Sequence, residues 1–219
     1  MCGVYMDLTK IQQFSKERLA GDLTGHDYRH ICRVIKNAND IMKDETLAQS
    51  QVDLIHAAIY VHDVIDDKVT TDPDKALQDV DQCLKDACVT EEEIHHIHDI
   101  ITHMSYSRNL QSRYELTLEG QIVQDADRID SLGAMGIART FYYAGQAGHL
   151  LYDEERPRDL ETLTTDNYRN QGTAINHFYE KLIHLHKTMN RPSAKHLAKE
   201  RTEVIESFLD QFNHEAYRS

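Results

Sequence analysis

Hydrophobic residues recur every three to four positions along most of this chain, which is the spacing of amphipathic helices. Residues 50–63 form a more apolar segment than residues 26–45. The stripe in residues 26–45 consists of Ile31, Val34, Ile35, Ala38, Ile41 and Met42. No stretch of useful length alternates between hydrophobic and polar residues, so we expect an all-α fold.

Two helix starts are marked by their capping residues. Asp72 followed by Pro73 is typical of a helix start, because Asp caps the first amides and Pro suits the first helical position. Thr90 and Glu93 have the spacing of a capping box. The helix after Thr90 has a hydrophobic face of Ile94, Ile97, Ile101 and Met104.

The second half of the chain predicts further helices. Residues 118–147 hold one or two, in which Gly120, Gly133 and Gly136 allow close approach of neighbouring elements. The polar residues 152–165 predict a loop. Two more amphipathic helices are expected at 166–189 and 193–217.

The expected architecture is a compact bundle of about eight helices in a single domain over residues 1–219. Only 3 prolines and 9 glycines occur, which fits long helices with short connections. The motif-bearing part spans residues 22–140. The C-terminal helices, 166–217, either pack on that part or extend it, and they could pair with a second copy in a homodimer.

Charge and composition narrow the classes of partner. The net charge of −13 argues against binding a nucleic acid polymer or an anionic membrane, and it leaves room for a small anionic substrate held by a metal or a few cations. No apolar run approaches the roughly 20 residues of a membrane span. The N-terminal residues show no signal-peptide pattern, so we expect a cytoplasmic protein whose four cysteines are free thiols.

Histidines and aspartates lie against apolar helix faces in several segments. His26 and His30 are four residues apart and share one face of a helix. His62 and Asp63 follow an apolar run, and adjacent side chains on a helix diverge by about 100°. These two could therefore reach one ion only from a helix end. Taken singly, each segment is better explained by a hydrogen-bonded core histidine or a solvated surface pair than by a metal site.

Acidic residues also approach an apolar face near residue 127. Asp127 lies between Ala126 and Ile129, near the buried edge of the predicted helix. A buried carboxylate needs a partner, because burying it alone costs several kcal/mol, on the order of the penalty for an unpaired ion. A divalent cation would be such a partner.

Together these segments resemble the HD superfamily of metal-dependent phosphohydrolases, in particular small stand-alone bacterial HD-domain proteins. The resemblance covers residues 22–140 and is carried by "HDYRHICRV", "HDVIDDK" and "DADRIDSLGAMGIAR". It implies one divalent metal ion with four ligands, which are His30, His62, Asp63 and Asp127. Two imidazoles and two carboxylates suit Mn²⁺, Fe²⁺, Co²⁺ or Zn²⁺, and Mg²⁺ less well.

The resemblance also implies a reaction. The run "HDVIDDK" is similar to that of the alarmone hydrolases, whose acidic pair matches Asp66 and Asp67; these would orient or deprotonate the attacking water. Lys68, His26 and His103 would bind the phosphate. The implied activity is hydrolysis of a nucleotide or related phosphorylated metabolite, with a metal-bound water attacking phosphorus.

Two alternatives remain open from the sequence. One is a dinuclear HD phosphodiesterase or oxygenase, for which His98 and His103 are available, although a five-residue spacing places them on different faces of a helix. The other is a metal-stabilised binding protein without turnover. The acidic pair argues against the latter, since two extra carboxylates beside a metal site cost stability unless they have a role.

Overall fold

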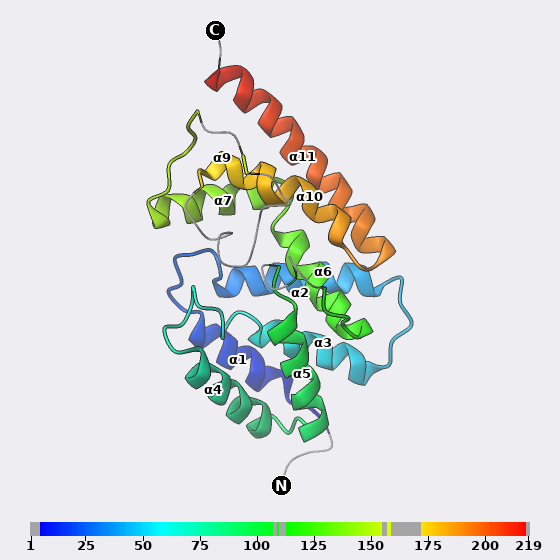
Figure 1. The fold of residues 1–219 in the computed structure, drawn as a ribbon. Coiled ribbons are helices and arrows are strands. Elements are labelled where there is room, and N and C mark those ends of the chain that lie inside the picture. Colours follow the sequence, from blue (N-terminus) through cyan, green and yellow to red (C-terminus); the bar gives the residue numbers. More distant parts are fainter. Residues whose placement is uncertain (1–4, 107–108, 110–112, 155–156, 159–171, 218–219) are drawn as a thin grey trace. The chain divides into compact units, whose positions relative to one another are not determined.

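The computed structural model describes residues 5–106, 109, 113–154, 157–158 and 172–217. Within these residues every regular element is a helix, as the hydrophobic spacing predicts (Figure 1). The chain divides into two compact units, Met1–Gln124 and Asp125–Ser219. The single-domain organisation stays a prediction.

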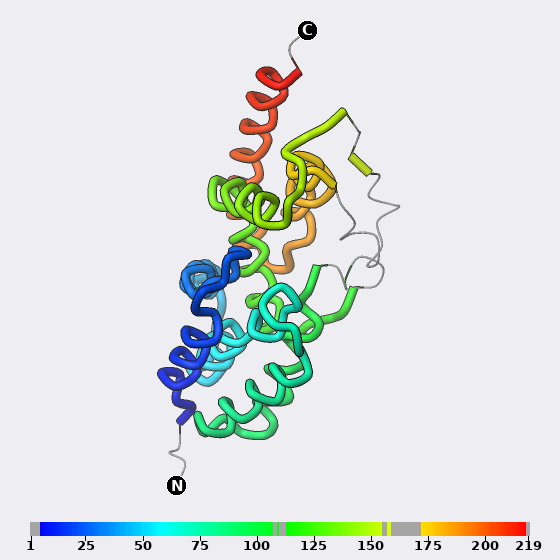
Figure 2. Tube along the Cα trace, turned by 90° about the vertical axis from the view of Figure 1, so that its left-hand side faces the viewer, coloured from blue at the N-terminus to red at the C-terminus, as the bar shows by residue number. Residues whose placement is uncertain are grey.

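The described residues of the first unit form five helices and the beginning of a sixth. Their order is α1 (Leu8–Arg18), α2 (Tyr28–Met42), α3 (Gln49–Val61), α4 (Pro73–Asp86), α5 (Glu91–His103) and α6 (Leu118–Asp130). Helix α3 is central, because it packs against α1, α2 and α5, while α4 closes on α1 and α5 (Figure 2). The sequence pattern did not single out α1.

The predicted helix starts in this unit are confirmed. Asp72 caps α4 through the amide of Lys75, and Pro73 is its first residue. Thr90 accepts from the amide of Glu93, whose carboxylate in turn accepts from the amide of Thr90. Both boundaries rest on contacts within one turn, which explains why the sequence alone reveals them.

The second unit begins within α6 and continues with α7 (Gly133–Ala147) and α11 (Pro192–Ala216). Between these lies a chain of short segments. They are α9 (Ala174–His177), the π-helical η3 (Phe178–Leu182), α10 (Ile183–Leu185) and the 3-10 segment η4 (His186–Thr188). The expected helix over 166–189 is therefore irregular where it is described, and residues 166–171 lie outside the described residues, as does most of the predicted loop 152–165.

Residues 118–147 form two helices, and the break between them depends on glycine. A Cβ at Gly136 would lie 2.2 Å from the carbonyl oxygen of Ser131, which no side chain tolerates. The predicted close approach at this position is confirmed. Helix α7 packs against α9 and α11.

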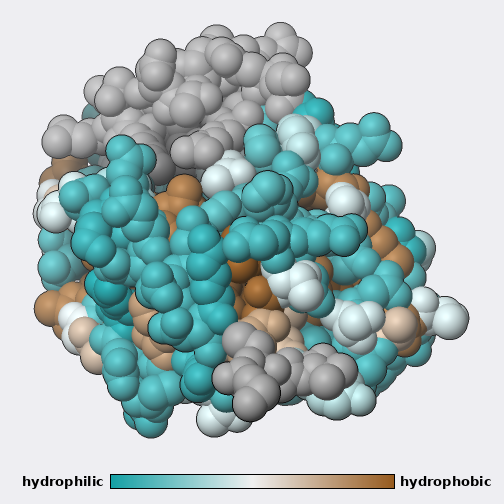
Figure 3. All heavy atoms as spheres, turned by 90° about the horizontal axis from the view of Figure 1, so that it is seen from below, coloured by the Kyte–Doolittle hydropathy of each residue, from teal (hydrophilic) through white to brown (hydrophobic). Residues whose placement is uncertain are grey.

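Polar side chains dominate the face of the molecule drawn in Figure 3, where hydrophobic areas are small and separated. The described helices include none with the length and apolar character to cross a membrane.

Helix α4 ends with a strained residue that offers a stability test. Cys88 has φ 60°, and the amides of Cys88 and Val89 bond back to the carbonyls of Lys85 and Leu84, the pattern of a Schellman motif. This left-handed conformation costs an L-residue roughly 1–2 kcal/mol, a cost that glycine avoids. We expect Cys88→Gly to raise the free energy of unfolding by about 0.5–1 kcal/mol, measured by urea denaturation.

The matched control is Cys83→Gly, the same chemical change inside α4. Glycine in a helix interior is destabilising by roughly 0.5–1 kcal/mol relative to alanine, so this variant should move in the opposite direction. A loss of stability at both positions would contradict the strain at Cys88.

Candidate metal centre

His30 is held in the first turn of α2 by the cap that starts the helix. The carboxylate of Asp27 accepts a hydrogen bond from the backbone amide of His30 at 3.1 Å. His30 lies on the stripe that faces the interior, next to Ile31 and Val34, and its side chain is 0% exposed. The hydrophobic spacing of α2 therefore directs this imidazole inward.

His62 lies where α3 ends. The helix stops at Val61, so His62 is its C-terminal cap and Asp63 lies beyond it. His62 Nδ1 is 2.8 Å from the carbonyl oxygen of Ile59. A carbonyl only accepts, so Nδ1 carries the proton and Nε2 of the neutral ring presents a lone pair. This is the tautomer that a metal-binding histidine with a carbonyl partner adopts.

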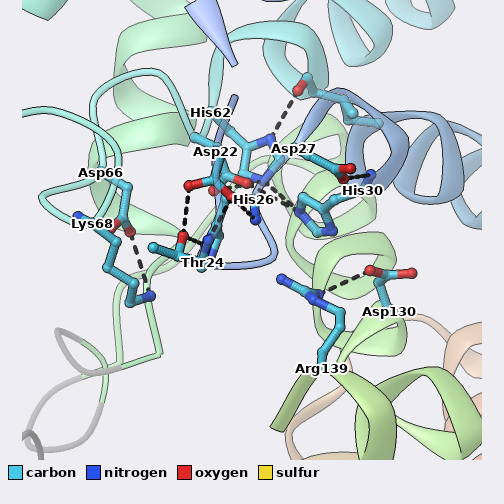
Figure 4. Close-up of polar contacts among 12 residues, drawn as sticks. Asp22, Thr24, His26, Asp27, His30, His62, Asp66, Lys68, Asp130 and Arg139 are labelled. Carbon is cyan, nitrogen blue, oxygen red and sulfur yellow. Dashed lines mark hydrogen bonds and ion pairs between the residues drawn. The ribbon is translucent and has the colours of Figure 1, made fainter. Parts of the chain in front are cut away.

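Three side chains of the first unit converge at this point. Nε2 of His30 and Nε2 of His62 are 3.4 Å apart (Figure 4). Asp63 Oδ2 lies 3.1 Å from His30 Nε2, and Asp63 Oδ1 lies 3.2 Å from His62 Nε2. Ligand atoms around a small divalent ion are about 3.0–3.4 Å apart when the metal–ligand bonds are about 2.1 Å.

The carboxylate of Asp63 lies buried beside the two imidazoles. Asp63 is only 6% exposed, and the one contact recorded for its Oδ2 among the described residues is that with His30 Nε2 at 3.1 Å. Burial opposes its ionisation, but the neighbouring His62, His26 and His30 outweigh burial and lower the pKa of Asp63. A buried carboxylate beside two imidazoles fits a divalent cation, since the cation would satisfy all three groups.

Asp127 lies on α6, one turn before that helix ends at Asp130. It belongs to the second unit, whereas the three converging side chains belong to the first. Asp127 is half-buried. Its assignment as the fourth ligand stays a prediction.

The acidic pair lies in the turn that follows the doublet. The amide of Asp66 donates to the carbonyl of Asp63 at 3.1 Å, which fixes Asp66 close to the doublet. Asp66 is half-buried and Asp67 is exposed. Burial raises the pKa of Asp66, and Asp63 and Asp67 raise it further, while Lys68 opposes them.

Lys68 is exposed, and it contacts the carboxylate of Asp66. Its amide donates to Asp66 Oδ1 at 2.9 Å, and its ammonium lies 3.9 Å from Asp66 Oδ2 (Figure 4). The lysine would have to share or exchange this contact to bind a phosphate. Its role in substrate binding stays a prediction.

The other predicted phosphate ligands have different surroundings. The ring of His26 meets that of His30 edge-on, with 6.0 Å between centroids. His103 ends α5 and stacks on Tyr114 at 3.8 Å, and its Nδ1 donates to the carbonyl of Asp99 at 2.8 Å. The predicted role of His103 therefore has less geometric support than that of His26.

The histidines of α5 that would serve a dinuclear site diverge. His98 forms an ion pair with Asp81 of α4, whereas His103 stacks on Tyr114. His96 bonds to the hydroxyl of Thr117. The contacts of His98 and His103 agree with the expectation that these two lie on different faces of the helix.

The sequence patterns did not single out Asp22 and Thr24, two residues in the loop before α2. Asp22 and Thr24 bond to each other, and Thr24 also bonds to His26 (Figure 4). The only available signal was their position within four residues of His26, in "GDLTGHD". Neither residue belongs to the motif that carried the resemblance.

Comparisons with known proteins also indicate an HD domain. The HD domain family model matches residues 27–132, from the cap of α2 to just beyond α6. Bacillus subtilis YpgQ is 33% identical over 203 residues, which cover 92% of this chain and 90% of YpgQ. The crystal structure of YpgQ in complex with ADP has a TM-score of 0.73 at 30% identity, covering 95% of this chain and 97% of that one.

Two further solved structures are similar over nearly the whole chain. A Lactobacillus plantarum protein has a TM-score of 0.87 at 43% identity, covering 96% of this chain and 97% of that one. An HD-superfamily hydrolase from Bacillus thuringiensis has a TM-score of 0.71 at 36% identity, covering 97% of both chains. Identity at this level over this length reflects common descent rather than a shared fold alone.

Proposed function

We propose that this chain, which belongs to the HD superfamily, is a metal-dependent phosphohydrolase that acts on a nucleotide or a related phosphorylated metabolite. The observation that carries the proposal is the convergence of His30, His62 and Asp63 within 3.1–3.4 Å of one another. Such a cluster of lone pairs and a carboxylate is poorly stable without a cation between its members.

We propose that His30, His62, Asp63 and Asp127 hold one divalent transition metal ion. The buried Oδ2 of Asp63 and the tautomer of His62 support the first three as ligands. The order of the motif in the sequence supports Asp127. When bound, the cation would polarise a phosphoryl oxygen and offset the charge of the phosphate.

The residues of the turn after the doublet supply the proton chemistry and part of the binding. Asp66 or Asp67 takes the proton of the attacking water, because both carboxylates follow the ligand doublet within one turn. Lys68 then contributes positive charge to a chain with a net charge of −13. Such a chain attracts an anionic substrate only through a few local cations of this kind.

The nucleotide class is supported by the YpgQ relative, which was crystallised in complex with ADP. A hydrolytic reaction at phosphorus would fit a cation held by imidazoles and carboxylates beside an acidic pair better than redox chemistry would. The first substrates to test are nucleoside triphosphates, followed by alarmones and cyclic dinucleotides.

We expect the purified protein to release phosphate or pyrophosphate from a nucleoside phosphate in the presence of Mn²⁺, and chelation by EDTA to abolish the release. Product formation would be followed by ³¹P NMR, which distinguishes the two leaving groups. The screen would compare Mn²⁺, Co²⁺, Fe²⁺ and Mg²⁺. If none of them yields a phosphorus-containing product, the binding-protein alternative replaces the enzyme.

A further inference from the structure

The end of α5 carries a stacked pair of aromatic rings, apart from the three side chains that converge at the candidate metal centre. The imidazole of His103 lies nearly flat on the ring of Tyr114, with 3.8 Å between centroids and an interplanar angle of 10°. Tyr114 is 40% exposed, and the side chain of His103 is 41% exposed. The pair is therefore packed within itself and open to a ligand from outside.

Hydrogen bonds hold this pair in one orientation. The hydroxyl of Tyr114 donates to Asp99 Oδ1 at 2.6 Å, and Nδ1 of His103 donates to the carbonyl oxygen of Asp99 at 2.8 Å. The side chain of Asn109 joins the two backbones, because it accepts from the amide of Tyr114 at 2.9 Å and donates to the carbonyl of His103 at 2.7 Å. Both rings are thus fixed before a ligand arrives, which lowers the entropy cost of binding on them.

The pair lies where α5 is joined to helices that carry proposed metal ligands. Beside His103, the carbonyl of Met104 accepts from Nε2 of Gln124 at 2.9 Å. Gln124 is buried on α6, three residues or about 4.5 Å along the helix axis before Asp127. Helix α5 also packs against α3, the helix that leads into His62 (Figure 1).

The surroundings of the pair suit a base better than a phosphate. The carboxylate of Asp99 lies 3.2 Å from Nδ1 of His103, and its negative charge would repel a phosphate at that point. Stacking of a base on an aromatic side chain needs no cation, and it typically strengthens binding about 5- to 150-fold. In a chain with a net charge of −13, stacking is a source of affinity that the net charge does not oppose.

We propose that His103 and Tyr114 form a stacking platform for the base of the substrate, which makes the substrate a nucleotide and not a base-free phosphate ester. The proposal rests on the proposed function for the phosphate at the metal centre. It assigns His103 to the base, whereas the sequence motif suggests a phosphate contact. Asp99 and Asn109 are positioning residues, because they touch the rings or their backbones and hold them in place.

Stacking can be observed directly and without turnover. The chain contains no tryptophan, so Tyr114→Trp places a single indole at the platform. We expect ADP, added with Zn²⁺, to quench the fluorescence of this variant, because a base stacks on the indole. Pyrophosphate has no base and should leave the fluorescence unchanged. Tyr142→Trp is the matched control, because Tyr142 is an exposed tyrosine on α7, and ADP should not quench its fluorescence.

Binding constants separate the base from the phosphate. For Tyr114→Ala we expect the Kd of ADP to rise about 5- to 150-fold by isothermal titration calorimetry, with the Kd of pyrophosphate within about 2-fold of wild type. His103→Ala should show the same selective loss. Tyr142→Ala should bind both ligands as the wild-type protein does. Because Tyr114 is exposed, its removal leaves no buried cavity.

Four outcomes would overturn the proposal. The first is a wild-type protein that does not bind ADP, and the second is fluorescence of Tyr114→Trp that ADP does not quench. The third is a wild-type Kd for ADP in Tyr114→Ala. The fourth is an equal loss of ADP and pyrophosphate in His103→Ala, which would return this histidine to the phosphate. If wild-type protein hydrolyses no phosphorus compound, the proposed function fails, while the ADP titrations still decide whether the platform exists.

Discussion

His62→Ala and Asp63→Ala are expected to bind no divalent transition metal, while the wild-type protein binds about one ion per chain. The reason is geometric, since each variant removes one of three side chains whose ligand atoms lie 3.1–3.4 Å apart. Elemental analysis after dialysis against Mn²⁺ would give the stoichiometry. Asp127→Ala tests the fourth proposed ligand separately.

Thermal unfolding gives a second readout of the same loss. A ligand that binds only the folded state stabilises it by about 2.7 kcal/mol at a concentration of 100 times Kd. Added Mn²⁺ should therefore raise the Tm of the wild-type protein and leave that of His62→Ala unchanged. His56→Ala is the matched control. His56 lies on α3, the helix that ends just before His62 and Asp63, but its side chain bonds to Asn39 of α2 and not to the metal ligands.

Metal content also discriminates between the alternatives. Full occupancy in both His62→Ala and Asp63→Ala would rule out the assigned site. A reproducible two ions per chain in the wild-type protein would favour the dinuclear enzyme. One ion together with no turnover on any phosphorylated compound would favour a metal-stabilised binding protein.

Asp66→Asn is expected to lower kcat on the order of 10²-fold or more while the metal stays bound, if Asp66 takes the proton of the attacking water. The substitution keeps the shape of the side chain and removes its basicity. Asp66 is half-buried and fixed to the carbonyl of Asp63, whereas Asp67 is exposed. We therefore expect the larger effect at position 66 and a smaller one for Asp67→Asn.

Asp72→Asn provides the control for this change. It makes the same substitution six residues away, at the cap of α4, where Asn and Asp serve about equally well. Its activity and stability should stay close to wild type. If Asp66→Asn and Asp67→Asn both turn over substrate at the wild-type rate, the pair consists of ordinary surface acids.

The sequence by itself determined the helical fold, because helix formation depends on contacts over one or two turns. The stripe from Ile31 to Met42 lies in α2, and the caps at Asp72 and Thr90 start α4 and α5 as predicted. The same local logic fails between residues 174 and 188. There the hydrophobic spacing predicts one regular helix. The chain instead passes through π and 3-10 segments, and this stretch packs against α7 and α11.

The sequence also determined which residue types are available for a metal, and it selected His30, His62 and Asp63 together. It did not decide whether the doublet could reach one point, since adjacent side chains in a helix diverge by about 100°. The end of α3 at Val61 resolves this, because Asp63 lies outside the helix and is free of its geometry.

Only the tertiary structure decided which groups contact the ring nitrogens of these imidazoles. The carbonyl of Ile59 lies 2.8 Å from His62 Nδ1, and the hydroxyl of Thr24 lies 2.7 Å from His26 Nδ1. Neither partner has a distinctive spacing in the sequence, because a carbonyl belongs to every residue and a threonine in a loop is common. Such contacts depend on the exact path of the backbone, here through a helix end and the left-handed turn at Gly25, and that path is fixed when the helices pack.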